Sequence, residues 1–285
     1  MRIGYIGLGL MGRPCTLNLM KAGHELFVWA RRRASAEEVL TKGATWCDSI
    51  AEVASKSEII FLNVTNTTDV EGVLFGDNGV AASGNKGLTV VDMSTISATA
   101  TRAMAKRLAD YGMELVDAPV SGGTVGAING TLTFMVGASE QTFKRLEPVL
   151  SAMGSTITRI GDTGAGQVAK SCNQIVITGT IAAVAEAIKF AQAVGVDPKP
   201  VREALLGGFA SSKVLELHGL RMIDDNFAPG FKTTLHLKDI GIVEDIVNEL
   251  HLKMPITHLG HELLQKTVDA GYGEEDSSSM YKITE

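Results

Sequence analysis

The chain has 285 residues, of which 45% are hydrophobic and 20% are charged, so it is long enough to form two domains with substantial cores. Its formal net charge is −6 with both signs mixed along the chain, which argues against a nucleic-acid-binding surface. The first seven residues have the pattern of neither a signal peptide nor a membrane anchor, and we find no later apolar run of the ~18 residues that a span needs.

In the first half, apolar β-branched segments alternate with helical ones. Strands are predicted at residues 2–6, 25–29, 58–62, 88–92, 114–117, 131–136 and 155–160, and helices at 11–22, 35–42, 68–75, 97–111 and 139–153. This alternation predicts a parallel sheet with helices on both faces, ending near residue 163. Ligands of such sheets bind at the carboxyl ends of the strands, so the loops after the strands hold the candidate site residues.

The first strand is followed by a GxGxxG motif that opens a helix. Its residues are Gly7, Leu8, Gly9, Leu10, Met11 and Gly12. In this context the motif predicts a dinucleotide site: Gly7 for the tight turn, Gly9 for the approach of a pyrophosphate, and Gly12 for close helix–strand packing. The helix N-terminus presents N–H groups and a positive dipole end to the phosphates.

The second strand lacks the acidic residue that usually binds the ribose hydroxyls of NAD. Ala30 follows the strand instead, and Arg31, Arg32 and Arg33 come next. Because guanidinium groups bind phosphate through a fixed fork of donors, we predict a preference for NADP(H) over NAD(H). Arg31 and Arg32 are expected to bind the 2′-phosphate, with Ala30 beside them.

The next loops are polar. Asn63, Val64 and Thr65 follow the third predicted strand and are expected to cover the middle of the cofactor. Thr95 follows the fourth, where its hydroxyl could reach the nicotinamide ribose or amide, while Ser97 is a candidate cap for the next helix.

After the fifth strand, Ser121, Gly122 and Gly123 form a candidate carboxylate site. Adjacent glycines expose backbone N–H groups, and the serine hydroxyl adds a donor. A flexible turn without a ligand is the alternative on local grounds.

The second half, 164–285, is predicted to be all-helical, with helices at 167–194, after Pro198, and at 214–222, 233–250 and 255–270. Lys170 and Asn173 project from one face of the first of these helices. A helical lysine is usually solvated, but the flanking residues (Val168, Ala169, Cys172, Ile175, Val176 and Ile177) are expected to be buried. A buried ammonium needs a partner or a chemical role.

The three cysteines, Cys15, Cys47 and Cys172, are far apart. They form neither a disulfide framework nor a zinc pattern, so we expect reduced thiols, a cytoplasmic protein and no metal.

With these motifs assembled, the chain is similar to the β-hydroxyacid dehydrogenase family. The similarity covers nearly the whole chain and rests on residues 7–12, 92–95, 117–123, 164–173 and 238–239. Within the family, residues 207–212 and 229–239 resemble the tartronate semialdehyde (2-hydroxy-3-oxopropionate) reductases more than the 3-hydroxyisobutyrate dehydrogenases.

The resemblance implies a Rossmann-type dinucleotide-binding domain at 1–163, an all-α domain at 164–285 joined to it by a long inter-domain helix, and homodimers or homotetramers. It implies that Lys170 is the catalytic residue, and that Ser121, Gly122, Gly123 and Asn173 bind a small carboxylate substrate. It also implies that Thr95 and Lys238 contact the cofactor, and Phe231 is expected to pack beside the nicotinamide. Two features depart from the family: Ala30 replaces the usual Asn or Asp, and the C-terminal segment after residue 276 is short.

The expected reaction is hydride transfer to the carbonyl carbon of a short acid, with Lys170 as general acid and base. Reductases of 3-hydroxyisobutyrate, 4-hydroxybutyrate/succinic semialdehyde or L-threonate are the nearest alternatives. Imine reductases share the fold but generally lack the lysine, and a non-catalytic cofactor-binding homologue is the remote alternative.

Overall fold

The computed structural model describes all residues, 1–285, which form two compact units, Met1–Lys170 and Ser171–Glu285. The boundary lies inside one long helix, α8 (Ala165–Ala193). From the sequence we placed the division between residues 163 and 164. In the structure the first unit extends to Lys170, because backbone N–H groups at the start of α8 donate hydrogen bonds to Asp117 at the end of a first-unit strand.

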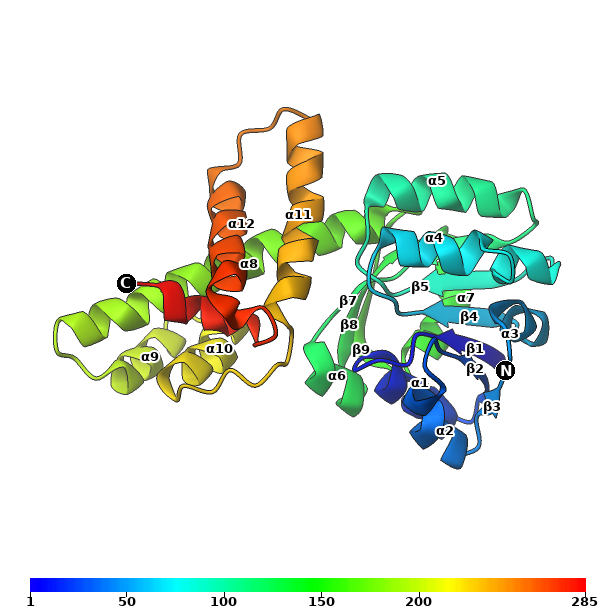
Figure 1. Ribbon diagram of the computed structural model, residues 1–285, viewed down its shortest axis with the longest axis horizontal. Coiled ribbons are helices and arrows are strands. Elements are labelled where there is room, and N and C mark those ends of the chain that lie inside the picture. Colours follow the sequence, from blue (N-terminus) through cyan, green and yellow to red (C-terminus); the bar gives the residue numbers. More distant parts are fainter. The chain divides into compact units, whose positions relative to one another are not determined.

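A nine-stranded sheet forms the centre of the first unit (Figure 1). Six of its strands run parallel, as the alternation predicted; these are β1 (Arg2–Ile6), β2 (Glu25–Trp29), β3 (Thr45–Trp46), β4 (Ile59–Leu62), β5 (Thr89–Asp92) and β6 (Glu114–Asp117). The other three are β7 (Val120–Ser121), β8 (Leu132–Gly137) and β9 (Gly154–Gly161). The order is β3-β2-β1-β4-β5-β6-β8-β7, and β9 pairs with β8.

The far end of the sheet departs from the parallel pattern. β8 runs antiparallel to both β6 and β7, and β9 runs parallel to β8. β3 and β7 were not predicted, because each has only two residues and a period-2 pattern needs more.

Helices cover both faces of this sheet, as expected. They are α1 (Gly12–Lys21), α2 (Glu37–Thr41), α3 (Ile50–Lys56), α4 (Thr67–Phe75), α5 (Ala98–Ala109), α6 (Gly123–Asn129) and α7 (Glu140–Leu150). Figure 1 shows α4 and α5 on one face and α1 and α2 on the other. The first face buries residues such as Val70 and Leu108, and the second buries Cys15, Leu19 and Val39. α3 and α6, seven residues each, were not predicted; α6 contains Gly123 and Gly126, which have low helix propensity.

The second unit is all-helical, as predicted. It contains most of α8, followed by α9 (Pro198–Leu206), α10 (Lys213–Ile223), α11 (Thr233–Glu249) and α12 (Pro255–Thr267), with a π-helical turn at Val268–Tyr272 and a 3₁₀ segment at Ser277–Ile283. Asp197 caps α9 through a hydrogen bond from Lys199 N at 3.0 Å, with Pro198 as the first helical residue. Ile181, Ile188, Ile240 and Leu264 lie in its core.

By length and composition alone, α8 is long and apolar enough to cross a membrane, contrary to our expectation that no segment would be. This is weak evidence of a span, because core helices pass the same test. Ile181, Ala185 and Ile188 of α8 are 0–4% exposed and belong to the core of the second unit.

The expectation that every residue around Lys170 is buried is wrong in part. Val168, Cys172 and Val176 recur every four residues and are exposed, forming one outward stripe of α8. Lys170 and Gln174 occupy a different stripe and are only 8% and 2% exposed. This part of α8 therefore exposes an apolar stripe, whereas Lys170 and Gln174 lie on a buried side.

Candidate active site

The glycine motif forms a tight turn between β1 and α1. Gly7 has φ +98°, and a Cβ there would lie 2.1 Å from the carbonyl oxygen of Asn63. At Gly12, a Cβ would lie 1.9 Å from the oxygen of Gly7, so both positions exclude side chains. At Gly9 a Cβ would meet no atom within 4 Å. This open space, and the absence of a side-chain cap at the α1 N-terminus, fit a dinucleotide pyrophosphate.

Three arginines follow β2, but their surroundings differ. The guanidinium of Arg33 lies over the Trp46 ring, 5.0 Å from the ring centroid, and forms a cation–π contact with it. Nη1 of Arg31 lies 3.5 Å from Oδ1 of Asp69, and 74% of the Arg31 side chain is exposed. Arg32 is exposed as well. All three arginines are therefore exposed, but Arg31 also pairs with Asp69 and Arg33 also contacts the Trp46 ring.

The loops after β4 and β5 are bonded to each other. The N–H of Val64 donates to Oγ of Ser94 at 2.9 Å, and the N–H of Ser94 donates to Oδ1 of Asp92 at the end of β5. Thr95 is half-buried in the second loop, while Asn63 is half-buried and Thr65 exposed in the first. These bonds place the predicted cofactor loops side by side at the carboxyl edge of the sheet.

Ser97 caps α5, as the sequence suggested. Its Oγ accepts a hydrogen bond from the N–H of Ala100 at 3.3 Å. Ser97 therefore serves the backbone of α5, and Thr95 lies two residues before it in the same loop.

The loop after β6 leads through Ser121 into α6. Gly122 and Gly123 have φ values of +124° and +59° and are exposed, and no side chain caps the helix that begins there. Ser121 is half-buried at the end of β7. These features suit a turn that presents backbone N–H groups to a carboxylate.

Asp117 bonds the start of α8 to the end of β6. Its carboxylate is 0% exposed and accepts hydrogen bonds from Gly164 N at 2.6 Å and Gln167 N at 2.9 Å. Burial raises the pKa of Asp117, and these backbone donors oppose that rise. Lys170 lies one turn further along the helix and is 8% exposed.

Sequence reasoning missed the side-chain role of Gln167. Its Nε2 donates to the carbonyl oxygen of Ser94 at 2.8 Å, and its Oε1 accepts from the N–H of Ile96 at 3.2 Å. Both bonds are buried and link α8 to the loop that carries Thr95. Because the partners are about 70 residues apart in the chain, no local sequence pattern indicated these bonds.

In the second unit, Asn173 belongs to a chain of polar contacts. Its Nδ2 donates to Oε1 of Gln174, and Nε2 of Gln174 donates to Oδ2 of Asp239, both at 2.8 Å. The other oxygen of Asp239 lies 2.8 Å from Nζ of Lys238, so these two neighbouring side chains form an ion pair. Gln174 was not predicted.

Phe231 begins the segment that leads into α11. Its ring lies 5.4 Å from the imidazole of His236, and Nε2 of His236 is 2.8 Å from Oγ1 of Thr178. The backbone of Phe231 is bonded to Asp276, since the N–H groups of Gly230 and Phe231 both donate to Oδ2 of Asp276 at 3.0 Å. The C-terminal segment thus positions Phe231, a role that sequence reasoning left open.

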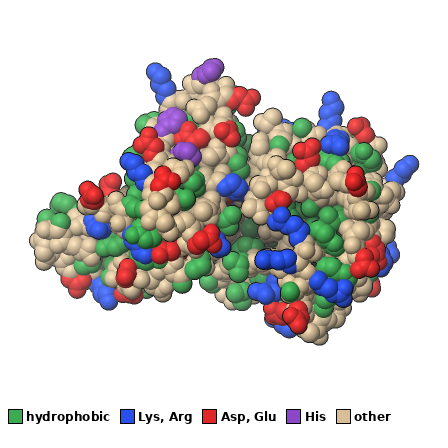
Figure 2. Space-filling model, in the orientation of Figure 1, with side chains coloured by type: hydrophobic (Ala, Val, Ile, Leu, Met, Phe, Trp, Pro, Cys, Tyr) green, Lys and Arg blue, Asp and Glu red, His purple; other side chains and the backbone are tan.

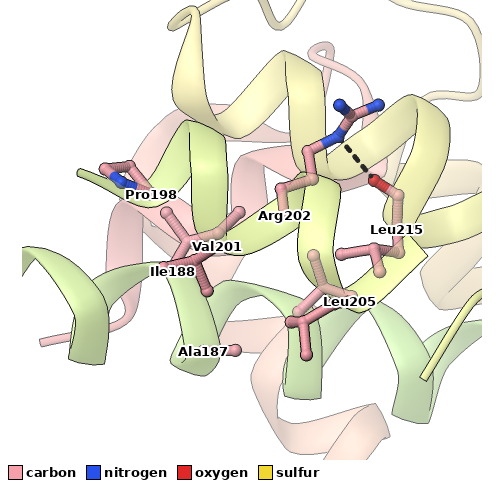
Figure 3. Close-up of a pocket in the computed structure, with 8 residues that line it drawn as sticks. Ala187, Ile188, Pro198, Val201, Arg202, Leu205 and Leu215 are labelled. Atoms are coloured by element: carbon pink, nitrogen blue, oxygen red, sulfur yellow. Dashed lines mark hydrogen bonds between the residues drawn. The ribbon is translucent and has the colours of Figure 1, made fainter. Parts of the chain in front are cut away.

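A small apolar hollow in the second unit does not belong to this site (Figure 3). Ala187, Ile188, Val201, Leu205 and Leu215 line it, and the Arg202 guanidinium turns away from it to donate to the carbonyl oxygen of Leu215 at 3.1 Å. It is a packing gap between α8, α9 and α10, far too small for a dinucleotide. No group of His, Cys, Asp and Glu side chains in the structure could hold a metal ion.

Two family models match the chain. The NAD binding domain of 6-phosphogluconate dehydrogenase matches residues 2–161, and the NAD-binding model of NADP-dependent 3-hydroxyisobutyrate dehydrogenase matches residues 164–284. The chain is 44% identical over 285 residues to the 2-hydroxy-3-oxopropionate reductase of Escherichia coli (strain K12), covering 100% of this chain and 97% of that protein.

Two further proteins resemble the chain over its full length. The 2-(hydroxymethyl)glutarate dehydrogenase of Eubacterium barkeri is 38% identical over 285 residues, which is 100% of this chain and 95% of that protein. The crystal structure of 3-hydroxyisobutyrate dehydrogenase from Salmonella typhimurium has a TM-score of 0.89 and 32% identity, and the match covers 99% of each chain.

Proposed function

The chain belongs to the β-hydroxyacid dehydrogenase family of NAD(P)-dependent oxidoreductases, and within it we propose that the protein reduces 2-hydroxy-3-oxopropionate (tartronate semialdehyde) to glycerate, with NADPH preferred over NADH. The observation that carries this proposal is Lys170. It is 8% exposed and lies one turn beyond an α8 N-terminus that is bonded to two loops of the dinucleotide domain. The 44% identity to a reductase of this substrate supports the choice of acid.

When bound, NADPH supplies the hydride that converts the aldehyde carbon of the substrate to an alcohol. Negative charge then develops on the carbonyl oxygen. The Lys170 ammonium stabilises that charge and donates its proton to the oxygen; in the oxidation direction the neutral amine accepts the proton.

The substrate carboxylate is assigned to Ser121, Gly122 and Gly123. The uncapped start of α6 and the serine hydroxyl offer hydrogen-bond donors and no opposing charge. Asn173, three residues after Lys170 on α8, is assigned to the substrate hydroxyl or carbonyl.

The cofactor is assigned to residues 7–12, to Ala30, Arg31 and Arg32 at the adenosine end, to residues 63–65, and to Thr95, Phe231 and Lys238. The exposed guanidinium groups of Arg31 and Arg32, and the absence of an acid directly after β2, support NADPH over NADH.

A substrate panel tests the proposal directly. Purified protein is assayed by NADPH absorbance with 2-hydroxy-3-oxopropionate, succinic semialdehyde and the aldehyde of 3-hydroxyisobutyrate. Oxidation of L-threonate and 2-(hydroxymethyl)glutarate is followed with NADP⁺. We expect the highest kcat/KM with 2-hydroxy-3-oxopropionate; a higher value for any other acid would assign the protein to that substrate instead.

We also propose a cytoplasmic homodimer or homotetramer. Acidic and basic side chains are interspersed on the face shown in Figure 2, which supports small-molecule rather than nucleic-acid partners. Large apolar side chains in the second unit are exposed, among them Val176, Phe190 and Ile256 at 60–70%, which supports association between copies. Light scattering coupled to size exclusion would contradict this if it gave the monomer mass.

A further inference from the structure

The side-chain amide of Gln167 bridges two consecutive peptide groups on either side of Thr95. Nε2 donates to the carbonyl oxygen of Ser94 at 2.8 Å, and Oε1 accepts from the N–H of Ile96 at 3.2 Å. The Gln167 side chain is 1% exposed, so water does not compete for these groups. The amide therefore acts on the loop as a neighbouring strand would, with one donor and one acceptor.

Two further hydrogen bonds extend this contact to neighbouring strands. The hydroxyl of Ser94 accepts from Val64 N, in the loop after β4. The backbone N–H of Gln167 donates to Asp117, at the end of β6. Gln167 is therefore bonded directly to the carboxyl ends of β5 and β6, and through Ser94 to the loop after β4.

Gln167 lies three residues before Lys170 on the same helix. In an α-helix this separation corresponds to about 4.5 Å along the axis, so any shift of the Gln167 backbone moves Lys170 with it. The same residue is hydrogen-bonded through its side chain to the peptide groups on either side of Thr95.

We propose that Gln167 is a positioning residue, which sets the distance between the cofactor loop at Thr95 and the proton donor Lys170. The proposal deepens the proposed function and rests on it, since it takes Lys170 as the proton donor. Substitutions of Gln167 should therefore impair turnover and cofactor binding more than the stability of the fold accounts for.

Two substitutions test the two hydrogen bonds. Gln167→Met keeps the length of the side chain and removes both bonds. In Gln167→Glu, the ionised carboxylate has no donor for the Ser94 oxygen, whereas the protonated carboxyl group has one. Burial favours the protonated form of a carboxyl group. Lowering the pH should therefore restore the turnover of Gln167→Glu but not that of Gln167→Met.

The measurements are kcat, KM for NADPH and the dissociation constant of NADPH by fluorescence, between pH 6 and 8.5. We expect Gln167→Met to lose at least about tenfold in kcat at every pH, with weaker NADPH binding. Gln167→Glu should match that loss at pH 8.5 and recover toward wild type at pH 6. A Gln167→Met variant within twofold of wild type, or a Gln167→Glu variant that stays as impaired as Gln167→Met at pH 6, would overturn the proposal.

Asn85→Leu is the matched control. The Asn85 amide also bridges backbone groups, donating to Ala54 O at 2.8 Å and Ser57 O at 2.9 Å, but it lies before β5 and its partners lie before β4, at the amino ends of these strands. We expect it to lower the melting temperature without changing kcat or KM. Thermal unfolding of every variant shows whether a loss of activity comes from a less stable fold or from misplaced site residues.

Lys170→Ala, assayed in parallel, separates this proposal from the proposed function. If Lys170→Ala retains normal turnover, the proposed function fails. If Lys170→Ala is inactive while Gln167→Met behaves like wild type, only the positioning role fails.

Discussion

The carboxylate of Asp117 accepts a 2.6 Å hydrogen bond from the backbone N–H of Gly164, 47 residues later in the chain. Its second oxygen accepts from Gln167 N, so one side chain at the end of β6 provides both acceptors for the start of α8. Helix N-termini otherwise leave their first N–H groups without partners. The helix that carries Lys170 is thus directed by a residue four positions before Ser121.

Replacing Asp117 by Ala should therefore affect both stability and turnover. We expect the free energy of unfolding to fall by about 2 kcal/mol, from the lost cap and the hydrogen bonds to a charged acceptor. kcat should fall because Lys170 is no longer held in place. Denaturant unfolding and steady-state kinetics check this; a variant with wild-type kcat would show that the cap does not orient Lys170.

Lys170→Ala should lower kcat by about 10²–10⁴-fold, the range of a general acid–base group, while the affinity for NADPH stays near normal. Lys170→Met keeps much of the apolar stem, so it separates the loss of the proton donor from the loss of packing. Both variants should be equally inactive. Ordinary turnover in either one would remove Lys170 from the mechanism.

Gly9→Ala should impair cofactor binding without harming the fold. A Cβ at this position meets nothing within 4 Å, so the melting temperature should be unchanged, while the added methyl group occupies the space expected for the pyrophosphate. We expect the dissociation constant of NADPH to rise by about tenfold or more.

Gly7→Ala provides the contrast to Gly9→Ala. Its Cβ would lie 2.1 Å from a backbone oxygen and its φ is +98°, so it should destabilise the fold itself. Normal NADPH affinity in Gly9→Ala would place the cofactor elsewhere.

The arginines after β2 should differ in their effect on cofactor choice. Arg31→Ala and Arg32→Ala should each raise KM for NADPH about tenfold, because a charge-assisted bond to phosphate contributes about 1.5–3 kcal/mol. KM for NADH should change little.

Arg33→Ala is the control for this series, since its guanidinium lies over Trp46. An equal rise in KM for NADPH and NADH would mean that Arg31 and Arg32 do not bind the 2′-phosphate. A wild-type kcat/KM for NADH at or above that for NADPH would contradict the NADP preference altogether.

Asp276 should make the stability of the protein dependent on acid pH. Burial favours its neutral form, but hydrogen bonds from His218, Ser278 and Phe231 N outweigh that effect and hold the pKa of Asp276 well below its usual range. Because the folded-state pKa is below the unfolded value of ~3.9, the stabilisation is fully present above that pH and is lost as the pH falls.

Asp276→Asn should therefore lower the free energy of unfolding at pH 7 by about 3 kcal/mol, and the difference from wild type should shrink below about pH 4. Urea unfolding from pH 7 to pH 3.5 measures both. Glu274→Gln, which removes an exposed partner of Lys232, is the control and should have no measurable effect. A pH-independent difference for Asp276→Asn would contradict the argument.

Local patterns predicted most of the elements and the cofactor loop. Strand-helix alternation, the glycines at 7, 9 and 12, and the proline after Asp197 each act over a few residues, so a single segment reveals them. The short elements β3, β7, α3 and α6 were not predicted: β3 and β7 have only two residues each, and α6 contains two glycines, which have low helix propensity.

The sequence by itself determined the family, the α/β dinucleotide domain, the all-helical second unit and the candidate proton donor. Only the tertiary structure decided how these parts are held: which side of α8 is buried, how Gln167 joins Ser94 to Ile96, and how Asp276 bonds the segment before α11. The physical reason is the range of the contacts. These hydrogen bonds join residues 45 to 73 positions apart, and in the local sequence each partner looks like an ordinary residue of a loop or helix.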